Sequence, residues 1–194
     1  MTILTRATEA PKRSPESFAK LQPMEKSANY AFIDSQNLHL AIQGQGWNLD
    51  YKKFRVYLKE KHNVETAYIF IGYVPENATL YTSLQSFGFV VVFRPTLKNS
   101  EGVIKGNCDA ELVLQAMIDF EKYKQAIIVS GDGDFHCLVK YLREQGKLKC
   151  VLVPDMRRYS ILLNKAAEKH LAFMNNLRTK LEYKRLPHKK KRTS

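Results

Sequence analysis

The chain has 194 residues, 44% of them hydrophobic, and a formal net charge of +12. These figures suit one globular domain with a full core and short tails. No run of 18 uncharged apolar residues occurs, which excludes a transmembrane helix, and the first residues lack the apolar segment of a secretory signal.

The charge is unevenly distributed along the chain. Residues 178–194 contain eight basic and one acidic side chain, whereas residues 27–177 contain 18 basic and 15 acidic ones. Apolar residues are sparse before the middle region and after it, which is typical of disorder at the ends. We therefore expect a disordered N-terminal extension (1–26), a folded domain (27–177) and a basic C-terminal tail (178–194).

The three cysteines, Cys108, Cys137 and Cys150, are an odd number and form no C-x-x-C pair. This pattern argues against a disulfide framework and against a structural zinc site. A cytoplasmic location with no membrane partner fits best. The oligomeric state stays open, with a homodimer among the options.

Apolar runs alternate with helical patterns along the chain. The runs lie at 30–33, 66–72, 89–93, 126–130 and 149–154, and the helical patterns at 50–61, 77–87, 109–121 and 135–145. Gly146 follows the last of these helices as a candidate cap. Residues 95–107 and 155–159 are expected to be loops, and helices at 160–169 and 175–183 are expected around a short strand near 171–174.

The strand sequences are apolar without alternation, which is typical of strands buried on both faces of a parallel sheet. The order of elements therefore predicts an α/β fold, a doubly wound, mainly parallel sheet of five or six strands flanked by helices, as in Rossmann-like proteins. In such a sheet the first and fourth strands are neighbours, and ligands bind at the carboxyl ends of the strands.

Four aspartates occupy this edge. Asp34 ends the first strand, Asp132 and Asp134 follow the fourth, and Asp109 opens the helix that leads into the fourth. Any single one of them is explained as well by a helix cap or a turn. All four together at compatible strand ends favour a site.

Clustered carboxylates need a cation, because two of them about 4 Å apart repel by roughly 4 kcal/mol at an effective dielectric constant near 20. Ligation by oxygen alone favours Mg²⁺ or Mn²⁺ over zinc. A calcium loop of the EF-hand type starting at Asp132 is excluded, because Cys137 and Arg143 stand where Gly and Glu are needed.

Three segments, AFIDSQNL (31–38), KGNCDAEL (105–112) and the stretch around SGDGDF (127–153), resemble the NYN domain, in particular its LabA-like branch. NYN domains belong to the PIN-like nuclease superfamily. The resemblance extends over about residues 30–183, and SGDGDF is its most specific part. Two residues depart from the family pattern: Ser35 stands where Gly is frequent, and Gln115 where a further Asp is common.

The resemblance implies a metal-dependent ribonuclease site. It places the catalytic and metal-binding acids on Asp34, Asp109, Asp132 and Asp134 and a polar partner on Asn37. It also implies that Ser130 orients a carboxylate or a phosphate and that Lys105 faces a phosphate.

The remaining nucleic-acid contacts are expected from position and charge. Arg157 and Arg158 follow the last main strand at the same sheet edge, where phosphate contacts and a solvated loop are equally good interpretations. The tail residues Lys189, Lys190, Lys191 and Arg192 are expected to bind RNA phosphates in a salt-sensitive way, and the alternative is a solvated tail that only aids solubility.

The leading hypothesis is therefore an endoribonuclease that uses Mg²⁺ or Mn²⁺ and cleaves RNA. The alternatives are a non-catalytic RNA-binding or scaffold protein of PIN-like fold, and an enzyme acting on another phosphate ester.

Overall fold

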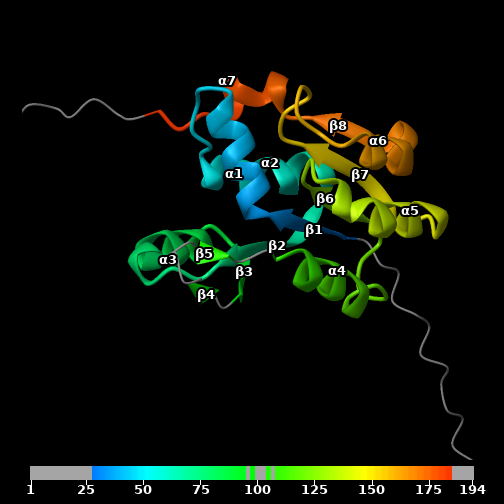
Figure 1. Cartoon of the computed structure of the whole chain (residues 1–194), viewed down its shortest axis with the longest axis horizontal. Helices are drawn as coiled ribbons and strands as arrows, with labels where there is room; N and C mark the ends of the chain where they lie inside the picture. Colours follow the sequence, from blue (N-terminus) through cyan, green and yellow to red (C-terminus); the bar gives the residue numbers. More distant parts are fainter. Residues whose placement is uncertain (1–27, 95–96, 99–103, 106–107, 185–194) are drawn as a thin grey trace, which may run out of the picture.

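The computed structural model describes residues 28–94, 97–98, 104–105 and 108–184. Its centre is a sheet of six strands in the order β3-β2-β1-β6-β7-β8, in which every neighbouring pair is parallel (Figure 1). The strands are β1 (Asn29–Asp34), β2 (Val64–Gly72), β3 (Phe89–Arg94), β6 (Ala126–Val129), β7 (Leu148–Val153) and β8 (Leu171–Phe173). The predicted doubly wound sheet and its strand order are confirmed, with a sixth strand at the expected place.

Helices cover both faces of this sheet. The α-helices are α1 (Ser35–Gly44), α2 (Tyr51–His62), α3 (Ala78–Ser86), α4 (Asp109–Ile118), α5 (His136–Glu144), α6 (Ile161–Ala167) and α7 (Arg178–Leu181). Short 3₁₀ turns, η1 (Pro75–Asn77), η2 (Gly133–Phe135), η3 (Glu168–His170) and η4 (Asn175–Leu177), begin or end several of them. Figure 1 shows α1, α2 and α7 on one side of the sheet and α4 on the other.

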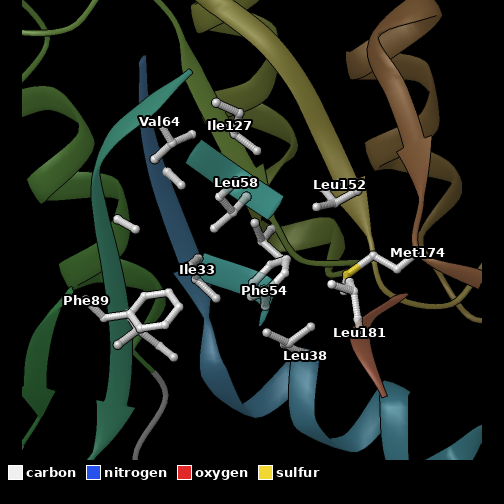
Figure 2. Close-up of a cluster of buried hydrophobic side chains, with 14 of the residues drawn as sticks. Ile33, Leu38, Phe54, Leu58, Val64, Phe89, Ile127, Leu152, Met174 and Leu181 are labelled. Carbon is white, nitrogen blue, oxygen red and sulfur yellow. The ribbon is translucent and has the colours of Figure 1, made fainter. Parts of the chain in front are cut away.

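The core forms two clusters because alternate strand residues point to opposite faces. Ile33 and Ile127 pack with α1 and α2 on one face, where Phe54 and Leu58 are fully buried (Figure 2). Phe32 packs with α4, α5 and α6 on the other face. The apolar runs without alternation follow from this double coverage at the central strands β1, β6 and β7, whereas Val90 and Phe93 on the edge strand β3 are 45% and 39% exposed.

The structure departs from the sequence prediction in three elements. Helix α1 was not expected; it begins directly after Asp34, whose side chain caps it by accepting from the Asn37 amide. Helix α4 ends at Ile118, three residues before the predicted end, and Asp119 is its C-cap. The expected loop 95–107 contains an antiparallel pair, β4 (Leu97–Lys98) and β5 (Ile104–Lys105).

Other expectations agree with the structure or fall outside it. Gly146 has a φ of +67° just after α5, as a helix C-terminal glycine does. None of the helices in the described part of the chain is long and apolar enough to span a membrane. The expected extension 1–26 and most of the tail, including Lys189, Lys190, Lys191 and Arg192, lie outside the described residues.

Candidate metal centre

The centre is built on the adjacent carboxyl ends of β1 and β6. Ile33 pairs with Val129 in register, so Asp34 and Ser130 leave the two strands side by side. The buried Ser130 hydroxyl donates to Asp34 Oδ2 at 3.1 Å and accepts from the Asp132 amide at 3.1 Å. This single hydroxyl therefore connects the two acidic segments, which is the orienting role that the resemblance implied for Ser130.

The turn after β6 holds its two aspartates by local hydrogen bonds. Asp132 Oδ1 accepts from the Asp134 amide at 3.0 Å and so caps η2. A side chain at Gly133 would collide with Ser160, which lies at the start of α6. The Ser160 amide also donates to the Gly131 carbonyl at 3.0 Å. The loops after β6 and β7 are therefore packed against each other, and this contact positions the backbone that carries the two aspartates.

Three of the four predicted acids come together at this edge. Asp109, Asp132 and Asp134 each offer one carboxylate oxygen, and these oxygens lie within 4.8 Å of one another. Magnesium holds oxygen ligands at about 2.1 Å, so two oxygens on opposite sides of it are about 4.2 Å apart. Small rotations of these side chains, of which Asp134 is exposed, would close the remaining difference. The donor set is therefore suited to Mg²⁺ or Mn²⁺.

Asp34 lies beside this group of three but is not part of it. Burial raises the pKa of its carboxyl, and the charges of Asp109 and Asp132 raise it further, while hydrogen bonds from the Asn37 amide and Ser130 oppose the shift. Each Asp34 oxygen accepts one of these hydrogen bonds and keeps a second lone pair. Asp34 can therefore still accept from a water molecule or face a cation.

Asn37 makes hydrogen bonds to both acidic segments. Its Oδ1 atom accepts from the Gly131 amide at 2.8 Å, and its own amide donates to Asp34. The Asn37 side-chain oxygen therefore joins the start of α1 to the loop after β6. We describe Asn37 as a positioning residue, because its contacts fix the two loops that carry the acids.

The predicted phosphate-binding arginines lie in the loop after β7, and the backbone of Arg158 lies against Gly131 in the loop that carries Asp132 and Asp134. Arg157 is 77% exposed at its side chain, with Nε 3.8 Å from the Asp155 carboxylate. The Arg158 guanidinium lies against Gly44 at the end of α1. Lys105 is in β5, but its side chain is outside the described residues.

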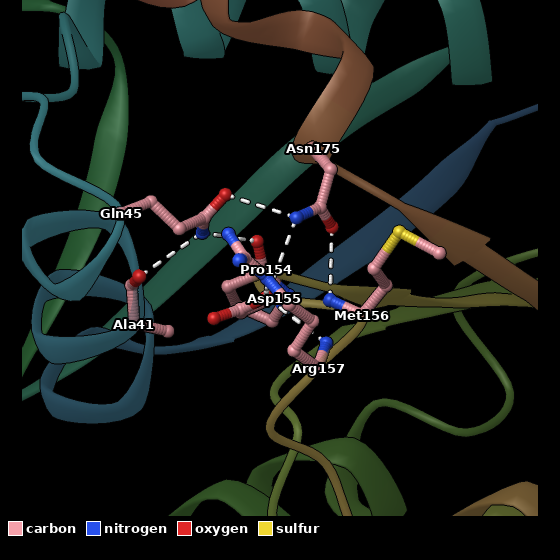
Figure 3. A network of polar contacts seen from close by, with 7 residues as sticks. All are labelled: Ala41, Gln45, Pro154, Asp155, Met156, Arg157 and Asn175. Atoms are coloured by element: carbon pink, nitrogen blue, oxygen red, sulfur yellow. Dashed lines mark hydrogen bonds and ion pairs between the residues drawn. The ribbon is translucent and has the colours of Figure 1, made fainter.

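A partly buried polar network holds the loop that carries these arginines, and sequence reasoning missed it (Figure 3). Asn175 accepts from the Met156 amide at 2.8 Å and donates to Gln45 Oε1 at 3.0 Å and to Asp155 at 3.3 Å. Gln45 in turn donates to the Pro154 carbonyl at 2.9 Å. These residues are far apart in the sequence and carry no shared pattern, so no local signal would have identified them.

The sheet topology and the acidic carboxyl edge define a doubly wound α/β protein with a candidate metal site at the ends of its parallel strands. Residues 30–173, well over half of the chain, match the family model of the NYN domain, and the chain belongs to that family. This match confirms the resemblance drawn from the three sequence segments.

Two known proteins are similar to this chain. The Low amplitude and bright protein LabA of Synechococcus elongatus is 28% identical over 122 residues, which is 58% of this chain. The aligned part spans 66% of LabA, just under two thirds of its length. A crystal structure of a protein of unknown function from Vibrio parahaemolyticus superposes with a TM-score of 0.67. It is 22% identical and covers 82% of this chain and 98% of its own, and this likeness shows the fold alone.

Proposed function

We propose that this chain is a metal-dependent endoribonuclease, with its active site at the carboxyl ends of β1 and β6. The observation that carries the proposal is the convergence of Asp109, Asp132 and Asp134 within 4.8 Å, in a domain of the NYN family. Such a group of carboxylates is stabilised by a divalent cation and repels itself without one.

Each residue of the centre has a defined task in this proposal. Asp109, Asp132 and Asp134 would hold Mg²⁺ or Mn²⁺, and Ser130 and Asn37 keep the acidic segments in place. A bound cation supplies a water of lowered pKa and stabilises the charge that develops on the phosphate. Each Asp34 oxygen keeps a second lone pair, with which Asp34 would orient the attacking water by accepting its hydrogen bond.

RNA phosphates are the expected partner of the positive charge around this centre. The RNA backbone on either side of the cleaved bond would be contacted by Arg157, Arg158, Lys105 and the tail (178–194). The proposed folded domain comprises residues 27–177. These contacts give affinity that depends on salt rather than on sequence. A cytoplasmic enzyme is proposed as well, since the three cysteines are free thiols.

The test compares two aspartates that both cap helices. Asp132→Asn removes a charge from the centre, and we expect Mn²⁺-dependent cleavage of labelled single-stranded RNA to fall about 100-fold or more, since metal activation contributes several kcal/mol. Asp50→Asn is the matched control: Asp50 caps α2 by accepting from the Lys53 amide, and Asn caps helices equally well. It should leave cleavage unchanged.

A second measurement separates the nuclease from a non-catalytic RNA-binding protein. Mn²⁺ at about 100 times its dissociation constant should stabilise the wild type by roughly 2.7 kcal/mol, and Asp132→Asn should reduce that gain. A wild-type protein that binds RNA and Mn²⁺ yet cuts none of several RNAs would contradict the nuclease. Cleavage that is equal in EDTA and in Mn²⁺ would contradict the metal centre.

A further inference from the structure

A cavity of about 350 Å³ opens beside the acidic centre, and Asp34 forms part of its wall. The cavity lies between the end of β2 and the helices α1, α2 and α3. Its lining residues are Asp34, Ser35, Gln36, His39, Tyr51, Phe70, Ile71, Gly72, Val74, Asn77, Leu80 and Cys108. The sequence gives no sign of this cavity, because its walls come from four separate segments.

The side chains that line the cavity indicate which kind of ligand it binds. Phe70, Tyr51 and Leu80 provide an aromatic and aliphatic interior, while Gln36, His39 and Asn77 supply hydrogen-bonding groups. The described lining residues include no lysine or arginine, which a phosphate group would need. A flat, uncharged, aromatic group with polar atoms at its edge is the ligand that such walls suit.

One wall of the cavity is fixed in advance by Tyr81. Its hydroxyl accepts from the Val74 amide at 2.8 Å and lies 3.2 Å from the Gly72 carbonyl. Its ring packs against Tyr73 at 5.9 Å and against Phe93 at 4.8 Å between centroids. The segment that follows β2 is therefore held in one conformation, and little ordering would be needed when a ligand enters.

We propose that this cavity binds one base of the RNA, in the nucleotide next to the phosphate held at the acidic centre. The proposal rests on the proposed nuclease function, because Asp34 is shared by the cavity and the centre. A nucleotide whose phosphate lies at the acids reaches into the cavity with its base. Gln36, His39 and Asn77 then contact the polar edge of that base and give the enzyme a sequence preference at this position.

The test fills the cavity with a larger side chain. Leu80→Trp places an indole in the cavity, while Leu40→Trp is the matched control, since Leu40 is 57% exposed on α1 and does not line the cavity. Binding of short fluorescent single-stranded RNAs is measured with Ca²⁺ in place of Mn²⁺, because Ca²⁺ takes the same carboxylate ligands and keeps a cation between the acids and the phosphate. We expect Leu80→Trp to weaken binding about tenfold, in line with the loss of one stacked base, and Leu40→Trp to bind as the wild type does.

Oligonucleotides with a single abasic position identify the bound base. One abasic position should weaken wild-type binding by a similar factor and should have no further effect in Leu80→Trp, because both changes remove the same interaction. His39→Ala, an exposed change that spares the fold, should alter the preference among homopolymers. It provides a second variant if Leu80→Trp does not fold.

The outcomes of this test are distinct from those of the nuclease test. If every abasic RNA binds like its parent and Leu80→Trp binds like Leu40→Trp, the base site is wrong, whether or not the protein cleaves RNA. If the coupling between Leu80→Trp and one abasic position is found without any cleavage, the base site stands and the nuclease is wrong.

Discussion

At the scale of single residues, Asp119 is an acid whose role differs from that of the acids at the sheet edge. Its buried carboxylate accepts from Tyr68 at 2.7 Å, from Gln115 at 2.8 Å and from Lys122 at 2.7 Å. Gln115, the departure from the family pattern on α4, is thus bonded to Asp119. We conclude that Gln115 has a structural contact here.

Replacing Asp119 should destabilise the fold without affecting the acidic centre. Asp119→Asn loses the charge that three donors surround, and hydrogen bonds to charged groups contribute about 1.5 to 3 kcal/mol each. We expect a loss of about 2 kcal/mol in the free energy of unfolding at neutral pH, measured by urea denaturation. Mn²⁺ should stabilise the variant as much as it stabilises the wild type. A smaller Mn²⁺ effect would mean that Asp119 acts on the centre.

The difference in stability between the wild type and Asp119→Asn should depend on pH, and the sign of this dependence is defined. Burial raises the pKa of Asp119, but the hydrogen bonds from Lys122, Tyr68 and Gln115 outweigh it and hold the pKa below its usual range. Because the pKa of Asp119 is lowered in the folded state, the ionised carboxylate stabilises the fold. This stabilisation is complete above the pKa of Asp119 in the unfolded chain, near 3.9, and it is lost as the pH falls through the pKa of Asp119 in the folded protein. The stability difference between wild type and Asp119→Asn should therefore shrink below about pH 4. A stability difference that stays constant down to the lowest pH would contradict this prediction.

At the scale of elements, the sheet and its main crossover helices were predictable, whereas α1 and the pair of β4 and β5 were not. The main strands are apolar runs, and the central ones are buried between layers of helices, so the sequence alone indicated the six strands and the order of the first five. Helix α1 was missed because it begins with the polar residues Ser35, Gln36 and Asn37 and buries only Leu38 and Ile42 beyond its first turn. Its real signal was Asp34, which is both a strand end and a helix cap.

The acidic site was predictable to the same extent and for the same reason. Strand order alone brings Asp34 next to the segment of Asp132 and Asp134. Which oxygens converge depends on the turn after β6, and that turn is fixed by Ser160 and Asn37 from other elements. The structure was therefore needed to show that Asp109, Asp132 and Asp134 converge without Asp34 and that a cavity lies beside them.

The network around Asn175 leads to a prediction about three elements at once. Asn175→Ala removes the hydrogen bonds that join η4 to the end of α1 and to the loop after β7, and it leaves the buried Asp155 with fewer donors. We expect a loss of about 1 to 3 kcal/mol and faster amide hydrogen exchange in residues 155–159. Amide hydrogen exchange in β2 and β3 should not change, except for exchange that requires global unfolding of the protein. Unchanged exchange at 155–159 would show that the loop is held by other interactions.

At the scale of the whole molecule, positive charge gathers on the face formed by α2 and α7. Four lysines, Lys52, Lys53, Lys61 and Lys180, line a groove of about 550 Å³ between these helices together with one acid, Glu60. The Tyr183 amide donates to the Asn48 carbonyl, which ties the end of the described chain to the segment between α1 and α2. The basic tail thus starts beside a face that is already positive.

This arrangement predicts that the tail extends the RNA-binding surface. Deleting residues 184–194 removes six basic side chains, Lys184, Arg185, Lys189, Lys190, Lys191 and Arg192. We expect weaker RNA binding and a shallower dependence on salt, by about 0.7 in the logarithmic slope for each phosphate of a single strand that the tail no longer neutralises. The control is deletion of residues 1–26, which carry five basic and three acidic side chains and should change the slope little. Binding is measured by fluorescence anisotropy at several salt concentrations. If the slope of the tail-deleted protein equals that of the wild type, the tail binds no phosphates and RNA binding depends on the folded domain alone.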